Sequence, residues 1–368
     1  MYKKHLFTAL LLMAAALFLR AGARYFAGFA DSYARTFNRI WVMTLGRASS
    51  VFPFSVVEFL ICGLILLLFF WIIRLILAWV HRKQESGKDK FIRAGRLFIG
   101  RVLVLVTLIF FLFEANEDIY FYCTPFSVRE GYGEGDYSTE DLAKCCTWLA
   151  DEAGRYADLV ERDGGGIMVM NADADTRIRE AMMDLGTSYG ELSGWYPRAK
   201  PVFFSRIMSL TNMAGIYSAY TIEANYNRDM TEYNHAFCAS HELSHLKGIM
   251  QENEANFVAY LCCMNSKEPD IHYSGLLSGW IYCGNEPYKR DRECWSEIYG
   301  TLDDRCIADL SANNAFWASY KGEISDAAES FNDAYLKGRG QEDGTESYDR
   351  VGTGSLLSCK RNCGKQQK

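Results

Sequence analysis

Two histidines four residues apart, His241 and His245, frame the part of this sequence best suited to chemistry. On a helix such residues lie one turn apart on the same face, so both imidazoles can bind a single zinc ion. Glu242 follows the first histidine and is rotated from it by about 100° around the helix. It would lie beside a bound metal, where a general base for a zinc-activated water belongs. The spacing therefore predicts a catalytic zinc site.

A third ligand is expected from the residues that follow. Gly248 can adopt the left-handed conformation that ends a helix, so the chain can reverse there. A third histidine at position 251 would complete a different zinc-protease pattern, but the sequence has Gln251. A second helix starting at Glu252 would place Glu252 and Asn256 on one stripe and Glu254 on another face. We favour Glu252 as the ligand and Asn256 as the polar partner of a ligand histidine, with Glu254 as the alternative.

Helices and strands must position these residues. A helix is expected from about Thr231 through the motif. The stretch 203–227 is rich in β-branched and aromatic residues and has no helical stripe, which predicts one or two strands. Helical spacing of apolar residues predicts further helices at 138–159, 173–185, 290–310 and 314–336.

The first third of the chain differs in composition from the rest. Its three predominantly apolar runs are candidate transmembrane helices, at 6–19, 57–80 and 97–113. No clear signal-peptide cleavage site follows the first run, so we interpret it as a retained anchor. Segment 21–55 has an aromatic residue at every fourth position from Tyr25 to Trp41, which fits an interfacial helix or, equally, a helix packed on the domain. Glu58 is expected to be a solvated carboxylate at a helix start, with a functional intramembrane group as the less favoured alternative.

Basic residues set the expected orientation. The connection 81–101 carries seven lysines and arginines, and two lysines lie near the N-terminus, so both are expected in the cytoplasm. Three crossings then place residues 114–337 outside the cytoplasm, followed by a mobile tail at 338–368. The four arginines of 21–55 do not fit this topology, because it places that segment outside the cytoplasm.

Composition narrows the function. The 368 residues are 49% hydrophobic and carry a formal net charge of −6, so a nucleic-acid partner is not expected. Three spans without a network of polar residues argue against a transporter. Peptide hydrolysis would also need a group that stabilises an oxyanion, and the candidates by chemistry are His235, His272, Tyr217, Tyr220 and Tyr282.

The motif and its downstream helix, HELSH…ENEANFVAYL, resemble the gluzincin clan of zinc peptidases. Most of the chain more closely resembles a bacterial three-span membrane family still labelled a domain of unknown function (DUF3810). The matching residues are Pro53, Phe54, Ser55 and Glu58 before the second span, Glu223, Ala224, Asn225 and Asn227 before the motif, and Phe316, Trp317, Tyr320 and Gly322 near the end.

The resemblance implies an α+β, mainly α fold, with transmembrane helices followed by a zincin-like (gluzincin) metallopeptidase domain. It implies His241, His245 and Glu252 as zinc ligands and Glu242 as the base. Asn256 departs from the aspartate that many gluzincins have, which removes a charge from beside the ligands. We expect a multi-pass cell-membrane zinc metallopeptidase that hydrolyses peptides or envelope proteins on the extracytoplasmic side. The alternative is an inert zincin-like sensor or scaffold that binds a peptide or protein partner.

Overall fold

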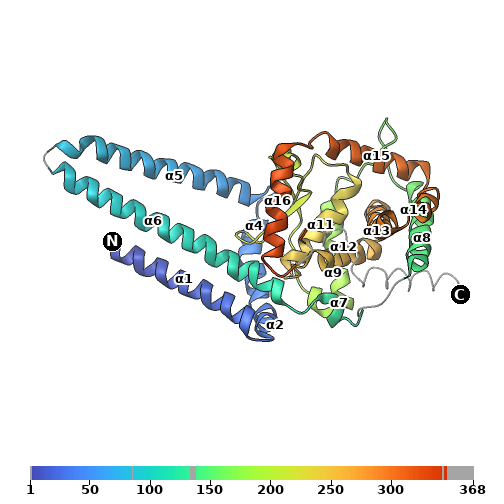
Figure 1. Cartoon of the computed structure of the whole chain (residues 1–368), viewed down its shortest axis with the longest axis horizontal. Coiled ribbons are helices and arrows are strands. Elements are labelled where there is room, and N and C mark those ends of the chain that lie inside the picture. The colour runs from blue at the N-terminus through green and yellow to red at the C-terminus, as the bar shows by residue number, and fades with distance from the viewer. Residues whose placement is uncertain (1, 85, 133–137, 342–343, 346–368) are drawn as a thin grey trace.

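The computed structural model describes residues 2–84, 86–132, 138–341 and 344–345. Within them the chain is mainly helical with one small sheet. Three long helices extend from one end of a helical domain (Figure 1). Most of the expected tail, 338–368, lies outside the described residues.

The three long helices are α1 (Tyr2–Tyr25), α5 (Val56–Val80) and α6 (Gly87–Asn116). Each is long and apolar enough to cross a membrane, and the most apolar window of α5 has no buried residue. Apolar side chains that no protein covers are stable in lipid and not in water. Three such helices lie where the sequence predicts spans, which is consistent with a membrane protein.

Segment 21–55 packs partly against the domain. It forms short helical pieces joined by the π-helical turns Ala34–Asn38 and Val42–Gly46, namely α2 (Phe29–Tyr33), α3 (Arg39–Trp41) and α4 (Arg47–Ser50). Tyr33 is buried, with its ring centroid 6.0 Å from that of Tyr120. Asn38 Nδ2 donates to the carbonyl of Leu246 over 3.0 Å. Tyr25 and Phe37 stay exposed, so the expectation of a helix packed on the domain holds for Tyr33 and not for these two rings.

The sheet has strand order β1-β3-β2, with β1 (Lys200–Pro201) parallel and β2 (Gly215–Ser218) antiparallel to β3 (Glu223–Tyr226). The prediction of strands in 203–227 is correct for β2 and β3. It is wrong for α10 (Ser205–Leu210), a helix that buries Met208 and exposes Ile207. A helix of six residues is too short for its period to stand out from the aromatic residues around it.

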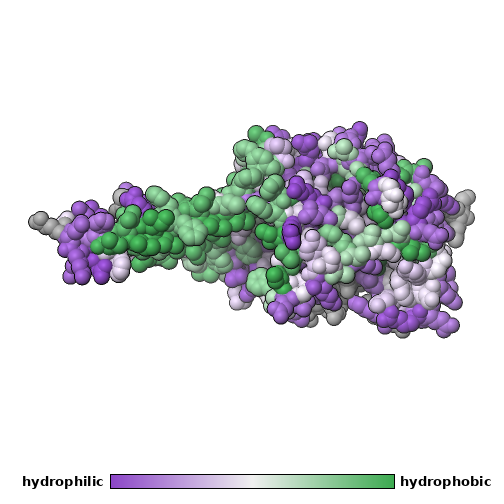
Figure 2. All heavy atoms as spheres, turned by 90° about the horizontal axis from the view of Figure 1, so that it is seen from above, coloured by the Kyte–Doolittle hydropathy of each residue, from purple (hydrophilic) through white to green (hydrophobic). Residues whose placement is uncertain are grey.

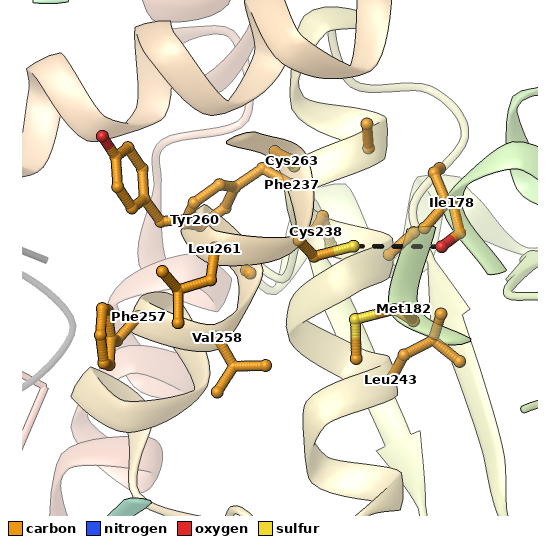
Figure 3. Close-up of a cluster of buried hydrophobic side chains, with 14 of the residues drawn as sticks. Ile178, Met182, Phe237, Cys238, Leu243, Phe257, Val258, Tyr260, Leu261 and Cys263 are labelled. Atoms are coloured by element: carbon orange, nitrogen blue, oxygen red, sulfur yellow. Dashed lines mark hydrogen bonds between the residues drawn. The ribbon is translucent and has the colours of Figure 1, made fainter. Parts of the chain in front are cut away.

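The remaining helices surround the centre of the domain. They are α7 (Phe126–Arg129), α8 (Thr139–Ala157), α9 (Ala174–Ser188), α11 (Tyr233–Leu246), α12 (Glu252–Asn265), α13 (Pro269–Arg290), α14 (Arg292–Tyr299), α15 (Asp304–Ala318) and α16 (Glu323–Lys337). Leu243 of α11, Val258 and Leu261 of α12 and Met182 of α9 form part of the buried apolar cluster (Figure 3).

Caps decide where several helices begin. Ser138 and Asp141 form the expected capping box at the start of α8. The predicted helix 290–310 is divided instead, because Asp291 accepts the N–H of Cys294 and Asp303 accepts that of Arg305. Each aspartate starts a new helix, α14 and α15.

Two buried carboxylates join α5 to the sheet. Glu223 of β3 accepts the backbone N–H groups of Val56 and Val57, at 3.1 and 3.0 Å, and pairs with the buried Lys200 ammonium. In return, Glu58 of α5 accepts the N–H groups of residues 203 and 204 at 2.9 and 2.8 Å. The expectation that Glu58 is solvated is wrong, because backbone donors replace water around its carboxylate.

We predict that Glu223→Gln destabilises the protein by about 3 kcal/mol, because it leaves the Lys200 ammonium buried without a counter-charge. Chemical denaturation of the full chain in detergent, followed by circular dichroism, measures this loss. The matched control is Glu180→Gln, whose carboxylate pairs on the surface of α9 and contributes less than about 1 kcal/mol. Equal stability of the two variants would contradict the structural role given to Glu223.

Candidate metal centre

The structure brings His241, His245 and Glu252 together. The two histidines lie on one face of α11, with ring centroids 4.6 Å apart. Glu252 begins α12, and its Oε2 lies 3.1 Å from Nε2 of His241 and 3.7 Å from Nε2 of His245. One donor atom from each residue lies within 4.8 Å of the others, and all three side chains are buried.

The outer nitrogens of both imidazoles are already engaged. Nδ1 of His245 lies 2.7 Å from the carbonyl oxygen of Ile249, and Nδ1 of His241 lies 2.8 Å from Oδ1 of Asn256. Both oxygens accept, so each Nδ1 carries the proton and donates it. The Nε2 lone pairs are then directed towards Glu252, as metal-binding histidines require. Asn256 takes the position expected for it from the sequence.

The donor set fits a cation. Nε2 of His241 and Oε2 of Glu252 are both acceptors when the imidazole is neutral, so their approach needs a proton or a metal ion between them. Burial alone would lower the pKa of His241, but the Glu252 carboxylate outweighs this, and the pKa is raised. Burial lowers the pKa of His245 to about 4, which keeps that imidazole neutral.

A tight turn places α12 against α11. Gly248 has φ +85°, the left-handed conformation expected from the sequence, and its N–H bonds to the carbonyl of His245 over 2.8 Å. A Cβ at this position would lie 3.0 Å from the ring of Tyr120. The turn leaves Glu252 in the first turn of α12, where the helix dipole favours a carboxylate.

Glu242 lies beside the three candidate ligands, under strand β2. Its side chain is buried, and its Oε2 has no hydrogen-bond partner among the described residues. Burial raises the pKa of Glu242 to about 8, opposed by His241 and reinforced by the carboxylates of Glu252 and Glu117. A carboxyl group shielded from water and able to change protonation near neutrality is suited to general acid–base chemistry.

Glu254, the alternative ligand, points elsewhere. Its carboxylate accepts the N–H of Ser127 at 2.7 Å and the hydroxyl of Ser127 at 2.8 Å. These bonds attach α12 to the first turn of α7. The structure therefore brings Glu252 to the histidines and assigns Glu254 a separate structural contact.

The five candidate oxyanion helpers fall into two groups. The ring centroid of Tyr217 lies 6.4 Å from that of His245, and Tyr282 Oη lies 3.5 Å from Oδ1 of Asn256. The other three are His235, which contacts the carbonyl of Met230, His272, which stacks on Tyr156, and the half-buried Tyr220. Of the five, Tyr217 and Tyr282 are the two that contact residues of the centre.

Two residues near the centre were missed in the sequence. Glu117 follows α6 and interacts electrostatically with both Glu242 and Glu252. Tyr335 of α16 donates its hydroxyl hydrogen to Glu117. The only sequence signal was a group of acidic residues after the third span, at 114–118.

Comparison with known proteins shows the family of this chain. Residues 33–353 match a family described as "Protein of unknown function (DUF3810)". No curated protein and no solved structure matches the chain.

We predict that Gly215→Ala destabilises the protein by about 1–3 kcal/mol, because its Cβ would lie 2.3 Å from Oε1 of Glu242 and 2.6 Å from Sγ of Cys238. The matched control is Gly164→Ala, which meets no atom within 4 Å. Denaturation of both variants in detergent gives the difference. If the two variants were equally stable, β2 would not pack as closely on Glu242 as the distances indicate.

Proposed function

The chain belongs to a family of proteins of unknown function, DUF3810, and we propose that this member is a membrane-anchored zinc-dependent metallopeptidase. One observation carries the proposal: two imidazole nitrogens and a carboxylate oxygen converge, and a further buried glutamate lies beside them. A structural zinc site is closed by four protein ligands and has no use for that glutamate.

His241, His245 and Glu252 would hold the zinc ion. Three protein ligands leave one coordination position for water or substrate, as in catalytic zinc sites. When bound, zinc supplies Lewis acidity that polarises a carbonyl group and lowers the pKa of water. Asn256 and the carbonyl of Ile249 keep the two imidazoles in the tautomer that binds metal.

Glu242 would move the proton. It would take a proton from the attacking water and pass it to the amine that leaves the cleaved peptide bond. Its unpaired Oε2 is the acceptor available for this task. Gly215 packs directly against this carboxylate, and because glycine has no side chain it leaves room for the carboxyl group of Glu242.

Strand β2 supports a peptide as the substrate. It is an edge strand of the sheet, and its first residue, Gly215, lies against Glu242. An extended peptide can pair with such an edge through main-chain hydrogen bonds, with little demand on its side chains. The scissile bond would then lie next to the base.

One observation supports an extracytoplasmic domain. The basic connection between α5 and α6 lies at the end of the spans remote from the domain (Figure 1), and basic connections prefer the cytoplasm.

Elemental analysis of the purified full chain tests the ligand set. We expect about one zinc per chain in the wild type and in Glu254→Ala, and loss of zinc in Glu252→Ala, because three protein ligands are needed. Glu254→Ala is the matched control from the same helical turn. No zinc in the wild type, after zinc is supplied at neutral pH, would contradict the proposal.

Glu242→Gln separates catalysis from metal binding. We expect this variant to keep its zinc and to lose peptide hydrolysis by about 100-fold or more, because the amide cannot accept the proton. Hydrolysis of a mixed peptide library, read by mass spectrometry, gives the rate. Zinc binding without hydrolysis in the wild type would favour the alternative of a zinc-stabilised sensor or scaffold.

Asn256→Ala tests the partner of His241. We expect zinc affinity to fall about 10- to 100-fold, because the imidazole loses the acceptor that fixes its tautomer. Competition with a coloured chelator measures the affinity. Asn265→Ala, at the other end of α12 and bonded to Asp184 on the surface, is expected to leave it unchanged. Equal affinities in the two variants would contradict the role of Asn256.

A further inference from the structure

A cavity of about 590 Å³ lies between α5 and α6, near the connection that joins them. It is far along the chain, and far in space, from the metal centre (Figure 1). Its basic lining residues are Arg74, His81, Lys90, Arg93 and Arg101. None of the lining residues in the described part of the chain is acidic.

Within the described ranges, the arginines and the lysine of this cavity have no carboxylate partner. Arg74, Lys90, Arg93 and Arg101 take part in none of the ion pairs found among the described residues. Arg101 lies over the ring of Trp71, with its Cζ 5.7 Å from the centroid. Four cations held around one space repel each other, and an anion in that space removes the repulsion.

The length of α5 indicates that the cavity would lie at the depth of the lipid headgroups. The α5 span continues through Lys83 for 28 residues, which is longer than the hydrocarbon core of about 30 Å requires at 1.5 Å per residue. The uncharged part of α5 ends at Ile73, and Arg74 follows it. The excess length carries the basic end of the helix pair into the headgroup layer, where arginine side chains prefer to lie.

The lining is also partly apolar. Trp71, Leu75 and Ala78 of α5 face Leu97 and Phe98 of α6 across it. Inorganic phosphate cannot make apolar contacts with such a surface, whereas the glycerol and upper acyl carbons of a phospholipid can pack against it. Exposed apolar side chains continue along α5 towards the domain, and Figure 2 shows the spans as a hydrophobic surface.

We propose that this cavity binds the phosphate headgroup of an anionic phospholipid, with the arginines around the phosphate and the acyl chains along α5. Basic pockets between transmembrane helices on the cytoplasmic side are suited to such headgroups. Arginine binds phosphate through paired N–H donors, so Arg74, Arg93 and Arg101 are the residues that select the ligand. The inference does not depend on the proposed peptidase activity.

The test compares two triple variants of the full chain in detergent. Arg74→Gln/Arg93→Gln/Arg101→Gln removes three cations from the cavity, and Lys83→Gln/Lys88→Gln/Arg96→Gln removes three from the same helix pair outside its lining. Native mass spectrometry counts bound phosphatidylglycerol, with phosphatidylcholine as the neutral-headgroup comparison.

We expect the wild type and the second triple variant to retain phosphatidylglycerol and not phosphatidylcholine. The cavity variant is expected to bind it about tenfold more weakly or worse. Equal weakening in the two variants would show a general effect of net charge and overturn the site, and so would equal retention of the two lipids. If inorganic phosphate at the same concentration displaces the lipid fully, the phosphate site stands and its ligand is free phosphate.

A measurement on the wild-type chain covers the case in which the cavity variant does not fold. A phosphatidylglycerol carrying a photoreactive group near its headgroup is expected to label peptides from 71–78 and 90–101. Unlabelled phosphatidylglycerol should compete and phosphatidylcholine should not. Labelling spread evenly over the three spans would overturn the proposal.

Discussion

The burial of three ionisable side chains inside an apolar helix contact is the constraint on which this domain depends. Polar groups removed from water cost free energy unless each finds a partner. The contact between α11 and α12 therefore includes an acceptor for each imidazole, from Asn256 and from Ile249. The turn at Gly248 sets the distance between the helices, and Asn38 from the segment after α1 bonds to the last carbonyl of α11.

The histidines and Glu242 were predictable because their relation is local. A helix fixes which of three neighbouring side chains share a face, whatever the rest of the chain does. The same argument favoured Glu252 over Glu254 as the ligand. The contact that holds Glu254 comes from Ser127, which is far away in the sequence. Glu117 could not be placed from the sequence, because only the tertiary packing brings it near the centre.

The spans were predictable for a related reason: hydropathy sums over a window and needs no knowledge of contacts. Elements that depend on partners were harder. The six-residue helix α10 is too short to show a period, and the breaks before α14 and α15 depend on single capping aspartates. The environment of Glu58 depends on two backbone donors 145 and 146 positions along the chain.

The reciprocal carboxylates at the start of α5 also determine how firmly this helix is joined to the domain. A single hydrogen bond would leave the helix free to pivot. Here Glu223 of the sheet binds the start of α5, and Glu58 of α5 binds the segment that follows β1. The helix and the sheet are therefore joined at two points, so a change in the tilt of α5 would move strand β2 with it.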